Sequence, residues 1–191
     1  MDSYYLDDHI PAVDARFEAQ KIAFGPFSFQ AAYAMKQLGM LDAIAEVGDQ
    51  GINREDISAK TGLSHYAVNV LLEIGLGLGM MKYQDEEGTK VVLGKIGYFL
   101  YDDYLTKVNM DFMQDVCYDG AKELSSSLKS GKPEGLKHFG SWSTVYEALS
   151  LLPNQAKKSW FAFDHNYSDH IFPESLPVVF QSKPKQLFDI G

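Results

Sequence analysis

From Asn53 to Gly79 the sequence reads NREDISAKTGLSHYAVNVLLEIGLGLG, which predicts two short helices joined by a tight turn. Asn53 precedes an acidic first turn, so its side chain can cap a helix that runs to Lys60. Thr61-Gly62-Leu63 forms the turn, and Ser64 can cap the second helix. The inner face of that helix is apolar and comprises Ala67, Val68, Leu71, Leu72 and Ile74. Two short helices joined through a glycine make a helix-turn-helix.

A β-hairpin is predicted directly after the second helix. Residues 80–84 (MMKYQ) and 89–93 (TKVVL) flank the sequence Asp85-Glu-Glu-Gly88, in which the glycine supplies the positive φ angle of a turn. A hairpin in this position is the wing of a winged helix. The whole stretch therefore predicts a winged helix-turn-helix.

Further helices are predicted on the N-terminal side. Residues 11–24 and 26–47 read as two helices broken at Gly25-Pro26, because proline disrupts a helix interior but is tolerated in a first turn. Apolar residues recur in the second helix at spacings of three and four. They are Phe27, Ala31, Ala34, Met35, Leu38, Leu41 and Ile44. This apolar face suits a protein core or a dimer seam equally well.

Helices are also predicted on the C-terminal side. A long helix runs from Tyr104 to Lys129, a short one covers residues 143–152, and another extends from Asn154 to about Ile171, where Pro173 intervenes. The long helix has one apolar face, made of Leu105, Val108, Phe112, Val116, Gly120, Leu124 and Leu128. Together with the apolar face of residues 27–44, it exceeds what one small winged helix can cover, so we expect a homodimer.

The chain closes with Gln186-Leu-Phe-Asp-Ile-Gly191, after a short polar linker at residues 182–185. A short apolar run that ends in an acidic residue and a glycine is typical of the first strand of a doubly wound α/β domain, where it leads into a nucleotide-type binding loop. Taken alone, these six residues are an ordinary edge strand or tail. The fold class predicted for the chain is mainly α, with a winged helix-turn-helix, flanking helices and a helical linker that ends at a first Rossmann-like strand.

Composition bounds the class of protein. The chain has 191 residues, of which 46% are hydrophobic and 13% aromatic, enough for a packed core. Its start lacks the basic and apolar regions of a signal peptide, and no apolar run reaches the roughly 18 residues of a membrane span. Cys117 is the only cysteine, which excludes an internal disulfide framework. We expect a cytoplasmic protein with no membrane partner.

Charge argues against DNA as the partner of the helix-turn-helix. A recognition helix needs Lys, Arg, Asn or Gln to meet phosphates and base edges, yet residues 64–75 contain no Lys or Arg, one Asn and one Glu. Between Gly51 and Leu93, four Lys and Arg residues stand against six Asp and Glu residues, and the net charge of the chain is −9. We therefore expect no nucleic-acid partner and favour a role in protein–protein contact or a structural role.

Three segments carry a resemblance to a known family: Tyr146-Glu-Ala-Leu149, Trp160-Phe-Ala-Phe-Asp-His-Asn-Tyr-Ser-Asp-His170 and Leu187-Phe-Asp-Ile-Gly191. The chain resembles the S-adenosylmethionine (SAM)-dependent O-methyltransferases that have an N-terminal winged-helix dimerisation domain. Members show a Tyr-Glu element, a helix reading Phe-x-x-x-Met-Ser-Asp-His and, about twenty residues later, a Val-Asp-Val-Gly-Gly-Gly cofactor loop. This chain departs from the pattern with Tyr167 where the family often has Met.

The resemblance implies roles for individual residues. Substrate-binding positions are Phe163, Tyr167, His170 and, on the long helix, Asn109. Cofactor-binding positions are Ser168, Asp169, Ile171, Asp189 and Gly191. Residues 163, 167 and 170 are spaced four and three apart, so one face of a helix would present all three. Without the resemblance, Phe163 and Tyr167 read as core aromatics, and Asn109 reads as a surface or capping residue.

The resemblance also implies an organisation: a dimerisation domain over 1–101, a helical acceptor-capping region over 102–182, and the first strand of a truncated methyltransferase domain over 183–191. We expect this portion to lack the catalytic base, to bind no SAM by itself, and to serve a parent enzyme that methylates a small hydroxylated acceptor. The alternative is a winged-helix transcriptional regulator or a ligand-binding module. No metal site is expected, because His165 and Asp169 are only two possible ligands. Cys117 reads as a structural thiol.

Overall fold

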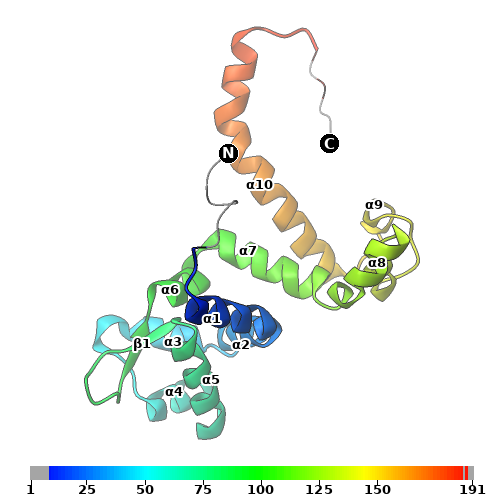
Figure 1. Ribbon diagram of the computed structural model, residues 1–191. Helices are drawn as coiled ribbons and strands as arrows, with labels where there is room; N and C mark the ends of the chain where they lie inside the picture. The colour runs from blue at the N-terminus through cyan, green and yellow to red at the C-terminus, as the bar shows by residue number, and fades with distance from the viewer. Residues whose placement is uncertain (1–8, 187, 189–191) are drawn as a thin grey trace. The chain divides into compact units, whose positions relative to one another are not determined.

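A computed structural model describes residues 9–186 and 188 (Figure 1). The chain divides into two compact units, with the boundary between Asp103 and Tyr104. Helices dominate both units, and the strands of the described residues form one two-stranded sheet. The prediction of a mainly α fold is therefore confirmed.

The first unit contains a helix-turn-helix and a hairpin in the predicted order. Its elements are α1 (Ala12–Ala23), α2 (Gly25–Gln37), α3 (Met40–Val47), the 3₁₀ turn η2 (Gly48–Gln50), α4 (Arg54–Thr61), α5 (His65–Gly77), β1 (Met81–Tyr83), β2 (Val91–Leu93) and α6 (Lys95–Asp102). Both predicted caps are present. Asn53 Oδ1 accepts from the backbone N–H of Asp56 at 2.8 Å, and Ser64 Oγ accepts from that of Ala67 at 3.2 Å.

Removal of the first cap gives a testable effect. The substitution Asn53→Ala leaves the N–H of Asp56 without its side-chain acceptor, and we expect it to lower the free energy of unfolding by about 1 kcal/mol. Asn53→Asp keeps an acceptor oxygen at the same position and should retain wild-type stability. Urea unfolding followed by circular dichroism measures both variants. Equal losses in the two variants would contradict the assigned cap.

The hairpin pairs Met81 with Leu93 and Tyr83 with Val91 in antiparallel register. Its turn is held by Asp85, whose carboxylate accepts from the hydroxyl of Thr89 and, at 2.7 Å, from the backbone N–H of the same residue. The hydrogen bond from the Thr89 side chain lowers the pKa of Asp85 below its ordinary value. One of the three acids at the wing tip therefore has a structural role in the turn.

The predicted helix over 26–47 is two helices, so that boundary was wrong. The chain turns at Gly39, which has a left-handed φ of 72° and separates α2 from α3. Only glycine adopts this conformation at no steric cost. The apolar spacing of three continues through the turn from Met35 to Leu38 and Leu41, which hides the break in the sequence pattern.

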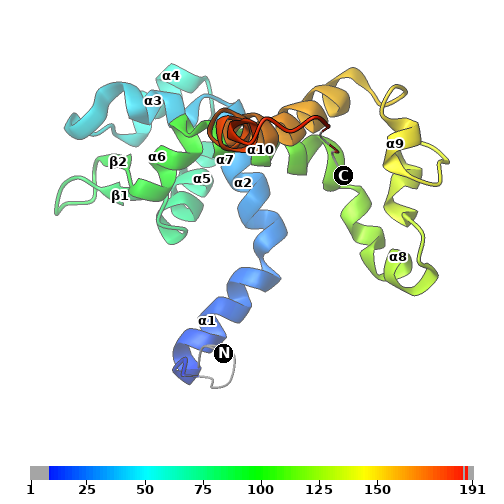
Figure 2. The ribbon, with the colours of Figure 1, turned by 90° about the horizontal axis from the view of Figure 1, so that it is seen from above.

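The core of the first unit gathers side chains from α2, α3, α4, α5 and the start of the hairpin. Its largest fully buried members are Met35, Met40, Leu41, Ile44, Ile57, Val68, Leu72 and Met80. By contrast, α1 has no buried residue, and Figure 2 shows it reaching from α2 away from the other helices of this unit. The predicted helix over 11–24 is thus confirmed, but its apolar side chains lie on the surface.

The second unit holds the remaining helices. They are α7 (Tyr104–Phe112), the π-helical segment η3 (Met113–Cys117), the 3₁₀ segment η4 (Gly120–Glu123), α8 (Leu124–Ser130), the 3₁₀ segment η5 (Glu134–His138), α9 (Val145–Ala148) and α10 (Asn154–Gln181). The prediction of one helix from Tyr104 to Lys129 was wrong, because the chain widens into a π-helix and then tightens into a 3₁₀ segment. The short helix predicted over 143–152 covers only four residues.

The last helix also differs from the prediction, because α10 continues through Pro173 and Pro177 to Gln181. A proline removes one helical N–H and leaves the carbonyl four residues earlier without that donor. The carbonyls concerned belong to Asp169 and Pro173, and both of these residues are exposed, so water can reach this side of the helix. The predicted strand over 186–191 falls mostly on residues outside the described part of the chain.

Candidate functional site

Helices α7 and α10 pack against each other, and aromatic rings fill the contact. Phe112 stacks on Phe163 with 4.0 Å between ring centroids. Trp160 meets Phe112 edge-on at 5.6 Å, and Tyr167 meets Phe163 edge-on at 5.1 Å. We call Phe112, Trp160, Phe163 and Tyr167 the aromatic column. The structure thus brings together two of the predicted substrate residues and adds Phe112 and Trp160 to them.

A hydrogen bond closes one end of the aromatic column. Tyr167 Oη donates to Asn109 Oδ1 at 3.2 Å, which joins residues 58 positions apart in the chain. Tyr167 remains 47% exposed, and Asn109 is half-buried. The pair therefore combines ring surface with the amide donors of Asn109 and the phenol oxygen of Tyr167. This combination can orient a molecule that has an aromatic ring and a hydroxyl group.

His170 lies one turn beyond Tyr167 on α10. Its ring Nδ1 is 2.7 Å from the backbone oxygen of Asn166. A carbonyl oxygen only accepts, so this contact assigns the proton to Nδ1 and leaves Nε2 as the acceptor of the neutral ring. The orientation of the imidazole is therefore fixed by its own helix.

Three of the five predicted cofactor residues, Ser168, Asp169 and Ile171, lie in the described part of the chain, on α10. Ser168 Oγ donates to the backbone oxygen of Asp164 at 3.2 Å, and the Asp169 carboxylate lies 3.4 Å from Nδ1 of His165. Ile171 is 60% exposed. Positions 168 and 171 lie on the same side of α10, and position 169 is turned by about 100° from position 168. Asp189 and Gly191 lie outside the described residues.

Asp115 is a residue that the sequence analysis missed. It lies in η3, and its Oδ2 accepts from Ser159 Oγ at 2.5 Å and from Gln155 Nε2 at 2.9 Å. Ser159 is buried, so the carboxylate ties the π-helical segment to the first turns of α10. A π-helical turn inside a helix is frequent at functional sites. In the sequence, the one feature that could have drawn attention to Asp115 is its position beside Val116, on the predicted apolar face of the long helix.

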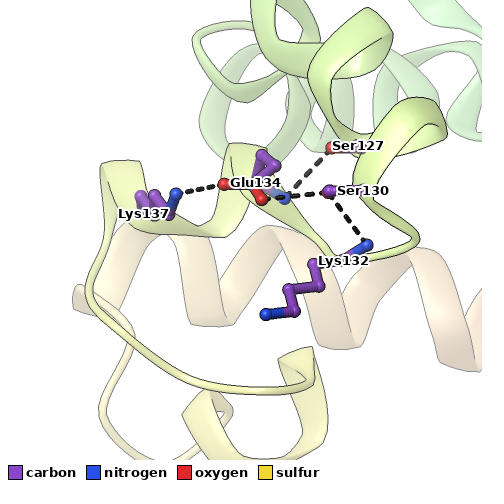
Figure 3. Close-up of polar contacts among 5 residues, drawn as sticks. All are labelled: Ser127, Ser130, Lys132, Glu134 and Lys137. Atoms are coloured by element: carbon purple, nitrogen blue, oxygen red, sulfur yellow. Dashed lines mark hydrogen bonds and ion pairs between the residues drawn. The ribbon is translucent and has the colours of Figure 1, made fainter.

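A cluster of polar side chains connects the end of α8 to η5, as Figure 3 shows. Ser130 Oγ donates to Glu134 Oε1 at 2.9 Å, and the backbone N–H of Glu134 donates to Ser127 Oγ at 3.0 Å. Lys137 bonds the other carboxylate oxygen, and this contact lowers the pKa of Glu134 below its ordinary value. These hydrogen bonds join α8 to η5, so the arrangement stabilises the loop between them.

Metal and thiol chemistry have no support among residues 9–186 and 188. No group of three His, Cys, Asp or Glu side chains there could hold an ion. His165 and Asp169 pair with each other on the exposed side of α10. Partial burial raises the pKa of the Cys117 thiol, which disfavours the nucleophilic thiolate. Within the described chain, no helix has the length and apolar character needed to cross a bilayer.

The helix-turn-helix does not present a surface suited to DNA. The side-chain oxygen of Asn69, the one amide of α5, is buried. Tyr66 and Glu73 are exposed on the same helix, and Glu86 and Glu87 are exposed on the wing. Lys82 and Lys90 are also exposed on the hairpin, so only the outer surface of α5 lacks Lys and Arg side chains.

Known proteins resemble this chain in sequence. Residues 16–87 match the family model described as Dimerisation2-like domain. The L-tyrosine C(3)-methyltransferase of Streptomyces lavendulae is 27% identical over 173 residues, which are 89% of this chain and 46% of that protein. The chain therefore spans about half the length of its curated relative.

Solved structures share the fold. The SAM-dependent methyltransferase SibL in its apo form aligns with a TM-score of 0.66 at 24% identity, over 80% of this chain and 44% of SibL. Human N-acetylserotonin methyltransferase in complex with SAM aligns with a TM-score of 0.57 at 17% identity, over 84% of this chain and 49% of that protein. The resemblance to SAM-dependent methyltransferases with an N-terminal dimerisation domain is confirmed.

Proposed function

We propose that this chain is the dimerisation and acceptor-capping part of a SAM-dependent methyltransferase that acts on a small hydroxylated aromatic molecule. Residues 1–101 form the dimerisation domain in this proposal, residues 102–182 cover the acceptor, and residues 183–191 begin the domain that binds the cofactor. The match of residues 16–87 to a dimerisation domain supports the first assignment. The aromatic column and its polar end support the second.

The observation that carries the acceptor assignment is the hydrogen bond between Tyr167 and Asn109. It holds a phenol and a carboxamide side by side at one end of the aromatic column. Aromatic faces bind planar rings, and a polar pair beside them fixes the direction of a hydroxyl group. These contacts support the assignment of Phe163, Tyr167 and Asn109 to the acceptor. The assignment of His170 rests on the family resemblance and on its position one turn after Tyr167 on α10.

Methyl transfer requires alignment of the acceptor atom with the donor and removal of a proton by a base. SAM supplies the electrophilic methyl group when it is bound. The proposed contribution of Phe163, Tyr167, His170 and Asn109 is to bind and orient the acceptor and to exclude water. His170, with Nε2 free to accept, can bond the acceptor's hydroxyl. We place no catalytic residue in this part of the chain.

Self-association is the second half of the proposal. The apolar side chains of α1 and of the start of α2 lie in water in a single copy. Ile22, Val13 and Phe27 are 81%, 80% and 77% exposed, and Phe17 and Phe24 are also exposed. Large apolar side chains exposed at several positions of one segment favour an interface with another protein chain. A second copy of the chain supplies the same surface in return, so we propose a homodimer through α1 and α2.

Methyl transfer itself is the test of the proposed function. The longest reading frame that contains this sequence is expected to methylate at least one phenol, such as L-tyrosine or 2-naphthol, with radiolabelled SAM. Tyr167→Phe removes the hydroxyl that bonds Asn109 and should raise KM for the acceptor about fivefold while leaving KM for SAM unchanged. Tyr146→Phe, which alters an exposed tyrosine on α9, serves as the matched control.

Two results would count against the proposal. One is an absence of methyl transfer to any phenol of the panel. The other is salt-sensitive binding of duplex DNA, which would favour the competing function of a winged-helix regulator. For the 191-residue chain itself, titration calorimetry with SAM is expected to detect no binding.

A further inference from the structure

The second unit contains an apolar cavity where the aromatic column ends at Trp160. Its volume is about 300 Å³. Trp160 forms part of its wall, together with Val116 and Cys117 of η3, Phe139 after η5, and Leu152 before α10. None of the proposed acceptor residues, Phe163, Tyr167, His170 and Asn109, lines this cavity, although Trp160 belongs to both its wall and the aromatic column.

One side of the cavity is formed by the backbone of two glycines. Gly120 of η4 and Gly135 of η5 both line it, and the two backbones touch. A Cβ atom on Gly135 would lie only 2.5 Å from the carbonyl oxygen of Gly120. The two 3₁₀ segments therefore approach more closely than side chains would allow, and no side chain at either position fills the space. The buried residues Ala148, Leu152 and Ala156 pack with Val116, Phe139 and Trp142 and support the wall.

The lining selects the kind of ligand. None of the residues that form the wall is charged, so a charged group inside would lose its hydration without an ionic partner. Phe139 and Trp160 offer ring surface, which favours a planar aromatic molecule over a flexible chain. The volume lies at the small end of the range for ligand pockets, which suits one or two fused rings and is too small for a peptide segment.

We propose that this cavity is a second small-molecule site, which binds an uncharged planar aromatic compound of one or two rings. The proposal concerns residues of the second unit only. It does not require methyl transfer, so its test is independent of the test of the proposed function.

Cys117 provides a direct readout, because it is the only cysteine of the chain and lines the cavity. The experiment measures the rate at which N-ethylmaleimide alkylates the full chain at mildly alkaline pH, where the thiolate is more populated. Saturating 2-naphthol is expected to slow alkylation at least tenfold. Decanol at its solubility limit, as an aliphatic probe, should slow it less than twofold.

Two variants separate the cavity from the rest of the surface. Ala121→Phe places a ring at the mouth of the cavity and is expected to weaken 2-naphthol binding in titration calorimetry at least tenfold. Lys122→Phe adds the same ring at an exposed position outside the lining and should leave binding unchanged. Circular dichroism verifies that both variants fold, and Cys117→Phe replaces Ala121→Phe if that variant does not.

Three outcomes would overturn the proposal. They are an alkylation rate unaffected by 2-naphthol together with no binding heat, equal protection by decanol, and equal binding by the Ala121→Phe and Lys122→Phe variants. The first would mean that the cavity is closed or filled in solution. The second would mean that the site does not discriminate planar rings from chains. The third would place 2-naphthol elsewhere on the protein.

Discussion

Gly97→Ala is expected to lower the free energy of unfolding of the first unit by about 3 kcal/mol. Gly97 is buried in α6 where this helix crosses the start of the hairpin. A Cβ atom at this position would lie 2.1 Å from the carbonyl oxygen of Met80, far inside van der Waals contact. The neighbour is backbone rather than the end of a flexible side chain, so the helix and the hairpin must move apart to accept the methyl group.

Urea unfolding followed by circular dichroism, combined with hydrogen exchange of residues 9–103, measures this loss. Gly77→Ala is the matched control, because a Cβ there meets nothing within 4 Å. Gly77 lies in α5 with an ordinary φ angle, so alanine should raise stability by about 0.5 to 1 kcal/mol. A Gly97→Ala protein as stable as the wild type would show that α6 does not approach Met80 so closely in solution.

The double substitution Ile22→Asp and Phe27→Asp is expected to weaken self-association at least a hundredfold and to yield a monomer at micromolar concentration. Each substitution occurs twice in a symmetric dimer, and each would bury a carboxylate against apolar surface. A hundredfold change corresponds to about 2.7 kcal/mol. Sedimentation velocity measures the mass directly. Both side chains are highly exposed in one copy, so the fold of the monomer should persist.

Tyr66→Asp is the control for this experiment. Tyr66 is also highly exposed, at 79%, but it lies on α5 rather than on α1 or α2. It should leave the dimer intact. A wild-type protein that sediments as a monomer would contradict the proposed homodimer, and a dimer disrupted only by Tyr66→Asp would place the interface on the helix-turn-helix.

Much of the first unit could be predicted because its signals are local. The caps at Asn53 and Ser64 act on backbone groups three residues away. The hairpin depends on a turn between Asp85 and Gly88. The break at Gly39 was missed although a glycine was present, because the apolar spacing continued across it and a helix and a turn both accommodate glycine.

The candidate site depended on contacts that no local pattern contains. The resemblance named Phe163, Tyr167, His170 and Asn109, but the pairing of Tyr167 with Asn109 and the stacking of Phe163 on Phe112 join separate helices. The widening of the predicted long helix into η3 accompanies the bonds that Asp115 receives from Gln155 and Ser159. The spacing of apolar residues predicts which side of a helix is buried. It does not predict which other helix packs against that side.

The sequence by itself determined the capped helix-turn-helix, the hairpin and the acidic character that disfavours DNA, because each follows from composition or from interactions within a few residues. Only the tertiary structure decided that α10 continues through Pro173 and Pro177, that α1 keeps its apolar side chains on the surface, and that two glycines open a cavity beside Trp160. These features depend on what surrounds a segment. Water can donate hydrogen bonds to carbonyls that proline leaves without a helical donor. The close approach of two backbones leaves a space that neither segment encodes alone.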